Sequence, residues 1–213
     1  MSVNLLFFVA VPLLDLRLQY AQVKDDVQRR MSALCDSQQF ILGAPVEELE
    51  SAVRDYTGCG HAIGASSGTD ALLALFMAMG IGRGDAVITT PYTFFATAGC
   101  IHRTGAEPVF VDIDAATYNL DPAKLEDCLR KKCHSGPDGR PVTAAGNRVR
   151  AIMPVHLFGC VCDMDRIGVL AREFDLPVVE DAAQAIGADY PSKAGRTMRA
   201  GAIGEASYFS FFP

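Results

Sequence analysis

The chain has 213 residues, of which 50% are hydrophobic and 21% are charged, a balance that predicts an ordinary globular protein with one α/β domain. Its formal net charge of -6 argues against nucleic acid or an anionic membrane as a partner, because both require clustered Lys and Arg.

The apolar run 5–14 is too short to cross a bilayer and has no basic residues ahead of it. We interpret it as a buried entry segment or as extra residues ahead of the true start, rather than as a signal peptide. The seven cysteines are odd in number and scattered through apolar segments, so they indicate buried thiols in a reducing compartment and a cytoplasmic protein. The alternative is a zinc site, with Cys128, Cys133, His134, Cys160 and Cys162 as candidate ligands. These residues do not show the paired Cys-x₂₋₄-Cys spacing that is typical of zinc knuckles.

Hydrophobic periodicity predicts two helices first, over 16–35 and 45–56. Strands and helices then alternate, with extended segments at 61–66, 86–90, 108–111, 150–155, 177–180 and 208–212, and helices at 69–79, 94–103, 122–132 and 164–174. The polar stretch 135–147 is predicted to be a flexible insertion, and 189–199 resembles a surface hairpin. This order predicts a three-layer α/β/α fold with a mostly parallel mixed sheet and a ligand at the carboxyl ends of its strands. Residues 1–37 would form an N-terminal segment and helix, and 38–213 the main domain.

The segment after the first predicted strand could bind an anion. Gly68 and Thr69 open a predicted helix, where backbone N–H groups and the Thr69 hydroxyl can converge on one phosphate. The alternative is a simple N-cap by Ser67 or Thr69 with nothing bound. A glycine cluster at 80–85 follows a helix and precedes a strand, the reverse of a dinucleotide-binding motif, so it predicts a helix end and a turn.

Two later strand ends carry polar groups. Asp181 follows the apolar pair Val178-Val179 and precedes Gln184, and a carboxylate buried there needs a cationic partner such as a protonated pyridine nitrogen. The alternative is an aspartate that caps the next helix. Ser210 lies among alternating apolar residues at another strand end, and its alternative is a buried serine bonded to the backbone.

An aromatic ring at a third strand end could stack on a flat cofactor. The segment Pro91-Tyr92-Thr93-Phe94-Phe95-Ala96-Thr97 supplies it, although aromatic residues at such places are usually core.

Taken in order, six segments resemble the DegT/DnrJ/StrS family of sugar aminotransferases. They are Ser66-Ser67-Gly68-Thr69-Asp70-Ala71-Leu72, Thr90-Pro91-Tyr92-Thr93-Phe94, Val111-Asp112-Ile113-Asp114, His156-Leu157-Phe158-Gly159, Glu180-Asp181-Ala182-Ala183-Gln184 and Phe209-Ser210-Phe211-Phe212-Pro213. The resemblance runs from about Pro12 to Pro213 and is weakest in 1–11 and 131–148. It implies the large domain of a type I pyridoxal 5′-phosphate (PLP) enzyme that works as a homodimer, with a small C-terminal domain absent here.

The resemblance also implies residue roles. Gly68 and Thr69 would bind the PLP phosphate with help from Ser210, and Phe94 would stack on the ring. Asp181 would pair with the ring nitrogen, and Gln184 would lie near the phenolic oxygen. For His156 we expect only a packed, hydrogen-bonded side chain.

In the family the last motif continues to the lysine that forms a Schiff base with PLP. That lysine is expected beyond Pro213, and Lys193 in the hairpin is no substitute. Because imine exchange and the proton shift need that base, we expect little or no transaminase activity from the 213-residue chain alone.

For the whole enzyme, the resemblance implies amino transfer, usually from glutamate, to a 3- or 4-keto group of a nucleotide-linked hexose. The segments Phe40-Ile41-Leu42-Gly43 and Thr117-Tyr118-Asn119-Leu120-Asp121-Pro122 look most like members that make 3-amino sugars for surface polysaccharides. Three alternatives stay open: a dehydratase with histidine in place of the lysine, a non-catalytic PLP-binding regulatory module, and an incomplete gene product.

Overall fold

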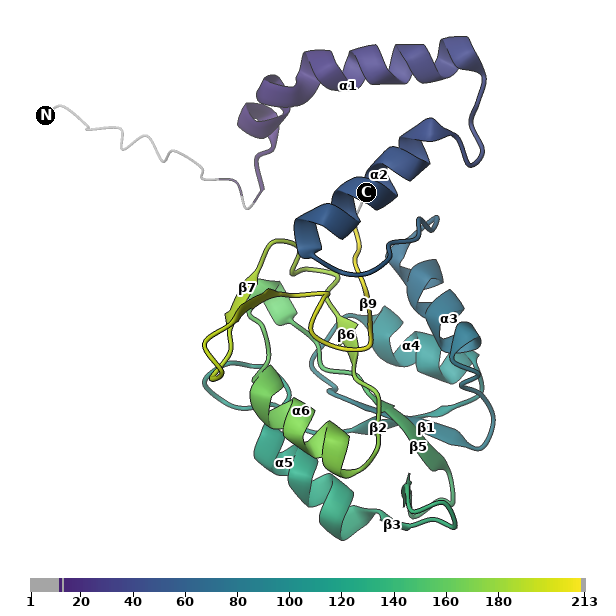
Figure 1. The fold of residues 1–213 in the computed structure, drawn as a ribbon, viewed down its shortest axis with the longest axis vertical. Helices are drawn as coiled ribbons and strands as arrows, with labels where there is room; N and C mark the ends of the chain where they lie inside the picture. Colours follow the sequence, from purple (N-terminus) through teal and green to yellow (C-terminus); the bar gives the residue numbers. More distant parts are fainter. Residues whose placement is uncertain (1–11, 13, 212–213) are drawn as a thin grey trace, which may run out of the picture. The chain divides into compact units, whose positions relative to one another are not determined.

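The computed structural model describes residue 12 and residues 14–211, and it divides into two compact units. The first unit, Met1–Glu47, contains helix α1 (Arg17–Ser37), and the second, Glu48–Pro213, contains the sheet (Figure 1). Helix α2 (Ala44–Thr57) begins in the first unit and ends in the second. Both predicted N-terminal helices are confirmed. Most of the apolar run 5–14, together with Phe212 and Pro213, lies outside the described residues.

The second unit is organised around parallel strands. Strands β2 (Glu107–Phe110), β1 (Asp85–Thr89) and β5 (Arg148–Ile152) pair in that spatial order, all parallel. Two parallel bridges, Ile152 to Val178 and Val155 to Asp181, connect this sheet to β6 (Val179–Asp181). Strand β9 (Ala206–Tyr208) pairs parallel to β6. The predicted mostly parallel sheet is therefore confirmed.

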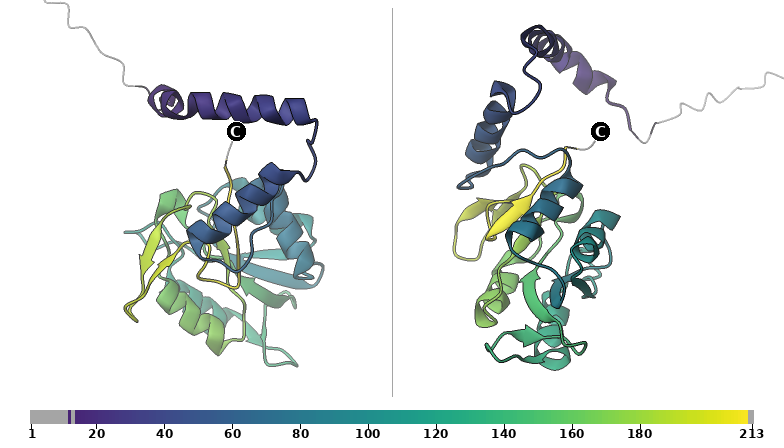
Figure 2. Two further views of the ribbon diagram at one scale, coloured as in Figure 1. Left: turned by 45° about the horizontal axis from the view of Figure 1, so that its top comes forward. Right: turned by 90° about the vertical axis from the view of Figure 1, so that its right-hand side faces the viewer.

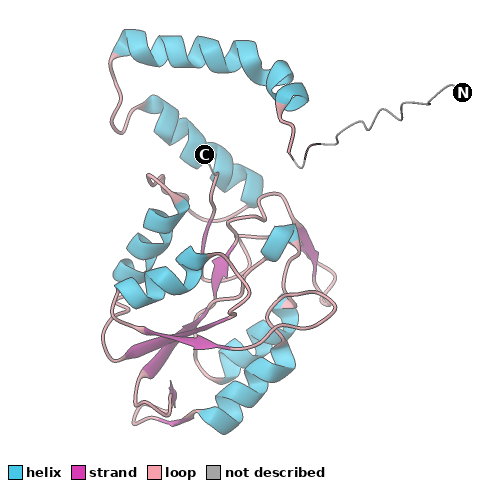
Figure 3. Cartoon of the chain, turned by 180° about the vertical axis from the view of Figure 1, so that it is seen from behind, coloured by secondary structure: helices cyan, strands magenta, loops and turns pink. Residues whose placement is uncertain are grey.

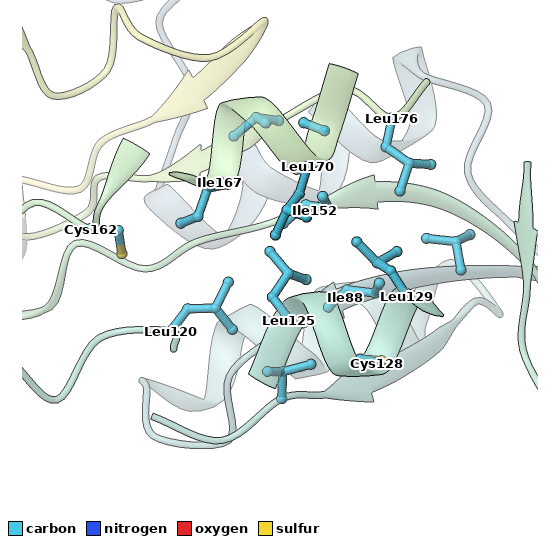
Figure 4. Close-up of a cluster of buried hydrophobic side chains, with 14 of the residues drawn as sticks. Ile88, Leu120, Leu125, Cys128, Leu129, Ile152, Cys162, Ile167, Leu170 and Leu176 are labelled. Atoms are coloured by element: carbon cyan, nitrogen blue, oxygen red, sulfur yellow. The ribbon is translucent and has the colours of Figure 1, made fainter. Parts of the chain in front are cut away.

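Helices cover the strands on both sides (Figures 1 and 2). Helices α3 (Gly68–Ala78) and α4 (Phe95–Arg103) pack together on one side, and α5 (Pro122–Asp127) packs with α6 (Met164–Glu173) on the other. Neighbouring strand residues point alternately to the two sides of the sheet. Val87 and Ala151 pack in the cluster with α3 and α4, whereas Ile88 and Ile152 pack in the cluster with α5 and α6 (Figure 4). Two separate cores thus hold a three-layer α/β/α unit together.

Three sequence predictions need correction. The segment 61–66 belongs to no strand, because no described strand pairs with it. The helix predicted over 122–132 ends as α5 at Asp127 and continues as one π-helical turn, Cys128–Lys132. The stretch 135–147 is not a free loop: β3 (His134–Ser135) and β4 (Pro141–Val142) form a hairpin, and Thr143 and Asn147 both bond the Glu107 carboxylate of β2.

The remaining elements lie near the ends of the strands. A single 3-10 turn spans Leu157–Gly159. Strands β7 (Asp189–Pro191) and β8 (Thr197–Arg199) form the predicted hairpin, drawn in magenta away from the central strands in Figure 3. Gly80 and Gly84 both have positive φ in the turn between α3 and β1, which confirms the reading of that glycine cluster as a helix end. Within the described ranges, no helix combines the length and apolar character that a membrane span requires.

Candidate functional site

The N-terminus of α3 is built by a short serine-rich turn. Ser67 is the N-cap, and its hydroxyl accepts the Asp70 N–H at 3.1 Å. The Asp70 carboxylate accepts hydrogen bonds from the hydroxyls of Ser66 and Ser67, which hold its pKa below the usual range. Of the two caps that the sequence offered, Ser67 is the one used. Within the described residues the N–H groups of Gly68 and Thr69 bond no backbone carbonyl, so both remain donors at the positive end of the helix.

Ser210 lies directly against this helix end. A Cβ atom placed on Gly68 would approach the Ser210 Cβ to 2.7 Å and its Oγ to 3.0 Å. Only glycine leaves room for so close an approach, so the contact explains why the helix begins with this residue. The structure thus brings together the three residues predicted to bind phosphate: Gly68, Thr69 and Ser210.

Asp181 is the last residue of β6 and is 4% exposed. One carboxylate oxygen accepts the Thr97 hydroxyl at 2.7 Å, and the other accepts the Ala183 N–H at 3.3 Å. Burial raises its pKa, although hydrogen bonds from Tyr208, Thr97 and Ala183 oppose the shift. The alternative reading of Asp181 as a helix cap is wrong, because turns follow β6 as far as 187 and no helix begins there.

Strand β9 links the two ends of the predicted site. Asp181 is paired with Tyr208 in the β6–β9 ladder, and Ser210 follows Tyr208 by two residues. Ser210, which contacts Gly68, thus follows directly on the strand that pairs with Asp181. A second link runs through the helices, since the Cys100 thiol of α4 bonds the Thr69 carbonyl of α3 at 3.4 Å.

The other two predicted cofactor contacts are exposed. Phe94 is the N-cap residue of α4, 68% exposed, one helical turn before Thr97. The Gln184 side-chain oxygen accepts the Phe158 N–H at 3.0 Å, which ties it to the 3-10 turn after β5. Phe158 itself has a positive φ of 54° and is 77% exposed. Gln184 follows Asp181 by three residues, and Phe94 precedes by three residues the threonine that bonds Asp181.

Next to Asp181, Glu180 has an architectural role. Its carboxylate is fully buried and accepts the Nε2–H of His156 at 2.9 Å and three backbone N–H groups, those of Gly201, Ile203 and Gly204. Burial raises its pKa, but these bonds outweigh burial and hold the pKa below the usual range. The Nδ1 atom of His156 accepts the Cys162 N–H at 3.2 Å, so the expectation of a packed, hydrogen-bonded histidine is confirmed.

Sequence reasoning missed the residues that surround Asp181. Thr97 and Tyr208 were read only as members of apolar motifs, yet both bond the Asp181 carboxylate. The signal for Thr97 was its place one helical turn after Phe94, which aims its side chain toward the same strand end.

No described cluster of three His, Cys, Asp or Glu side chains could hold a metal ion. Two of the candidate zinc ligands lie next to each other: the Cys133 N–H donates to the Cys128 carbonyl at 3.1 Å, and interaction with the Cys133 thiol, opposed by burial, lowers the pKa of Cys128 to about 7.

Comparisons with known proteins agree with this geometry. Residues 21–213 match the model of the DegT/DnrJ/EryC1/StrS aminotransferase family. The chain is 44% identical to the "Pleiotropic regulatory protein" of Geobacillus stearothermophilus, covering 95% of this chain and 49% of that protein. It is 39% identical to the UDP-2-acetamido-2-deoxy-3-oxo-D-glucuronate aminotransferase of Pseudomonas aeruginosa, covering 95% of this chain and 51% of that one.

Solved structures give the same result. A DegT DnrJ EryC1 StrS aminotransferase from Brucella abortus superposes with a TM-score of 0.84 and 34% identity, over 96% of this chain and 51% of that one. Two further neighbours contain PMP, the amino form of PLP. The chain therefore spans about half the length of the relatives it matches. On its sequence and its fold alike, it belongs to the DegT/DnrJ/EryC1/StrS aminotransferase family.

Proposed function

We propose that this chain supplies the PLP-binding part of an aminotransferase that acts on nucleotide-linked keto sugars. One observation carries the proposal: a buried carboxylate, Asp181, pairs with Tyr208, and Ser210, two residues further along, approaches a helix end so closely that only Gly68 fits there. Burial without a cation raises the Asp181 pKa, and no described Lys or Arg forms a salt bridge with it. A protonated pyridine nitrogen would supply that cation.

Each side chain then has a stated task. The N–H groups of Gly68 and Thr69 hold the phosphate with the Ser210 hydroxyl, at the positive end of α3. Asp181 keeps the ring nitrogen protonated, Phe94 covers the ring, and Gln184 lies toward the phenolic oxygen. PLP, when bound, withdraws electrons from the carbon atom that carries the transferred amino group.

The relatives support the substrate class. The Pseudomonas aeruginosa relative is named for a UDP-linked 3-oxo sugar, and further relatives are named for dTDP-linked and GDP-linked amino sugars. We propose glutamate as the amino donor, a 3-keto hexose as the acceptor, a cytoplasmic location and a homodimeric whole enzyme.

We further propose that these 213 residues alone have little transaminase activity. Three of their lysines are engaged away from Asp181: Lys124 bonds Asp112, Lys131 bonds Asp127, and Lys193 lies in the exposed hairpin near Asp163. Conversion of added PLP to PMP by glutamate, at an ordinary enzymatic rate, would contradict this proposal.

PMP binding to this chain tests the site itself. We expect Asp181→Asn to weaken binding about tenfold to a hundredfold, since it removes a hydrogen bond between charged groups. Asp127→Asn, which changes an exposed carboxylate on α5, is the matched control and should bind like the wild type. Equal affinity of the wild type and Asp181→Asn would overturn the assignment.

A second candidate is a regulatory protein that binds PLP without turnover. The name of the Geobacillus stearothermophilus relative favours it. Tight PMP binding without amino transfer would support this candidate over the enzyme, provided that transfer is also absent when the chain is joined to the remaining half of a full-length relative.

A further inference from the structure

Two threonine hydroxyls at the start of α4 form a chain of hydrogen bonds that ends at Asp181. The Thr97 hydroxyl donates to the Asp181 Oδ2 at 2.7 Å, and the Oγ1 atoms of Thr93 and Thr97 are 2.8 Å apart. A threonine hydroxyl has a single hydrogen, and Thr97 uses it on Asp181. Thr93 must therefore donate to Thr97, so the hydrogen bonds all point toward the carboxylate.

The start of α4 fixes this chain of hydroxyls. Phe94 is the N-cap, with extended backbone, and its carbonyl accepts the Thr97 N–H at 3.2 Å. Thr93 precedes this N-cap, so its hydroxyl reaches Thr97 from the bend that leads into α4. Thr97 is fully buried and Thr93 half-buried, so water does not compete for the Thr97 bond.

Other groups also face the Asp181 carboxylate. Tyr208 of β9 bonds it, and the Ala183 N–H bonds its second oxygen. His156, which follows β5, is bonded to Glu180 and not to Asp181. The thiol of Cys100 on α4 is buried nearby, and burial, together with the charge of Asp181, raises its pKa. Of these groups, Thr97 is the one that contacts a second threonine hydroxyl, that of Thr93.

We propose that Thr93 and Thr97 form a hydroxyl relay that keeps Asp181 ionised, and that they are thereby positioning residues for the protonated ring nitrogen of the cofactor. The inference rests on the proposed function, because it assumes that Asp181 meets that nitrogen. Neither threonine touches the reacting atoms.

The physical reason is the sharing of one proton between the ring nitrogen and Asp181. A buried carboxylate that loses a donor becomes more basic and takes the proton, which leaves the nitrogen neutral. Each donor aligned toward the carboxylate favours the opposite state. Because hydrogen bonds in series polarise one another, Thr93 strengthens the bond that Thr97 makes.

Nuclear magnetic resonance (NMR) on PMP labelled with ¹⁵N in the ring tests the relay without any turnover. The ¹⁵N shift distinguishes a protonated from a neutral ring nitrogen. We expect Thr97→Val to move the shift of the bound PMP toward the neutral value and to weaken binding about tenfold to a hundredfold. Thr97→Ser keeps the hydroxyl and should restore the wild-type shift. Thr93→Val should move the shift in the same direction by less.

The matched control is Thr143→Val, which removes the hydroxyl of another buried threonine bonded to a carboxylate, that of Glu107, at 3.1 Å. It should leave the bound ¹⁵N shift unchanged. A wild-type shift in Thr97→Val, or an equal displacement in Thr143→Val, would overturn the relay.

A second measurement separates this inference from the proposed function. ¹³C NMR of the Asp181 carboxyl group, titrated without PMP, should show a higher pKa in Thr97→Val than in the wild type. If that pKa rises but the wild-type chain and Asp181→Asn bind PMP with equal affinity, the relay acts on the carboxylate and the cofactor assignment fails. If the pKa does not rise, the relay itself is wrong.

Discussion

Replacing Glu180 with glutamine tests how the buried carboxylate supports the site. The two carboxylate oxygens together accept four hydrogen bonds, from His156, Gly201, Ile203 and Gly204. Glutamine offers one acceptor oxygen and an NH₂ group that only donates. Whichever way the amide turns, its NH₂ group faces two of the four donors and leaves them without an acceptor.

Each buried donor without an acceptor costs about 1–3 kcal/mol, so Glu180→Gln should lower the free energy of unfolding by about 2–6 kcal/mol. That is a large part of the about 5–15 kcal/mol typical of a domain. Urea unfolding at pH 7, followed by circular dichroism, measures the loss. The control is Glu173→Gln, because the exposed pair of Glu173 with Arg130 should contribute at most about 1 kcal/mol. A loss below about 1 kcal/mol for Glu180→Gln would refute the reasoning.

The same variant has a signature in pH. The folded-state pKa of Glu180 is lowered, so its ionisation stabilises the fold above the ordinary glutamate value of about 4.3. That contribution is lost as the pH falls through the folded-state pKa. The stability gap between the wild type and Glu180→Gln should therefore narrow in acid. A gap that stays constant from pH 7 to pH 3 would show that the carboxylate charge is not the cause.

Three further predictions concern single contacts, each measured as a change in urea unfolding. Gly68→Ala should cost about 1–3 kcal/mol, because the added methyl group overlaps Ser210, and Ser210→Gly in the same chain should recover most of that loss. Leu125→Ala should cost about 2–5 kcal/mol, since Leu125 is fully buried between α5 and the sheet, and a loss below 1 kcal/mol would mean that the core collapses around the gap. Asp121→Ala should cost about 0.5–2 kcal/mol, because Asp121 caps α5 by accepting the N–H groups of Ala123 and Lys124, whereas Asp121→Asn should keep most of the cap.

Local patterns predicted most elements because burial imposes a period on the sequence. The alternation of Val87 and Ile88 between two cores, and the apolar face of α6, are visible in the sequence itself. Prediction failed where tertiary partners decide. The segment 61–66 was predicted to be extended but pairs with no described strand, and the polar stretch 135–147 gains order from its bonds to Glu107 on a distant strand.

For the site, the sequence by itself determined the chemical groups and their order along the chain: a glycine at a helix start, a carboxylate at one strand end and a serine at another. Only the tertiary structure decided their surroundings. The packing of α3 against β9 brings Gly68 to Ser210, and the packing of α4 brings Thr97 to Asp181 across 84 positions of sequence. Contacts of such separation follow from which faces the helices and strands bury against one another, and no local period of the sequence encodes them.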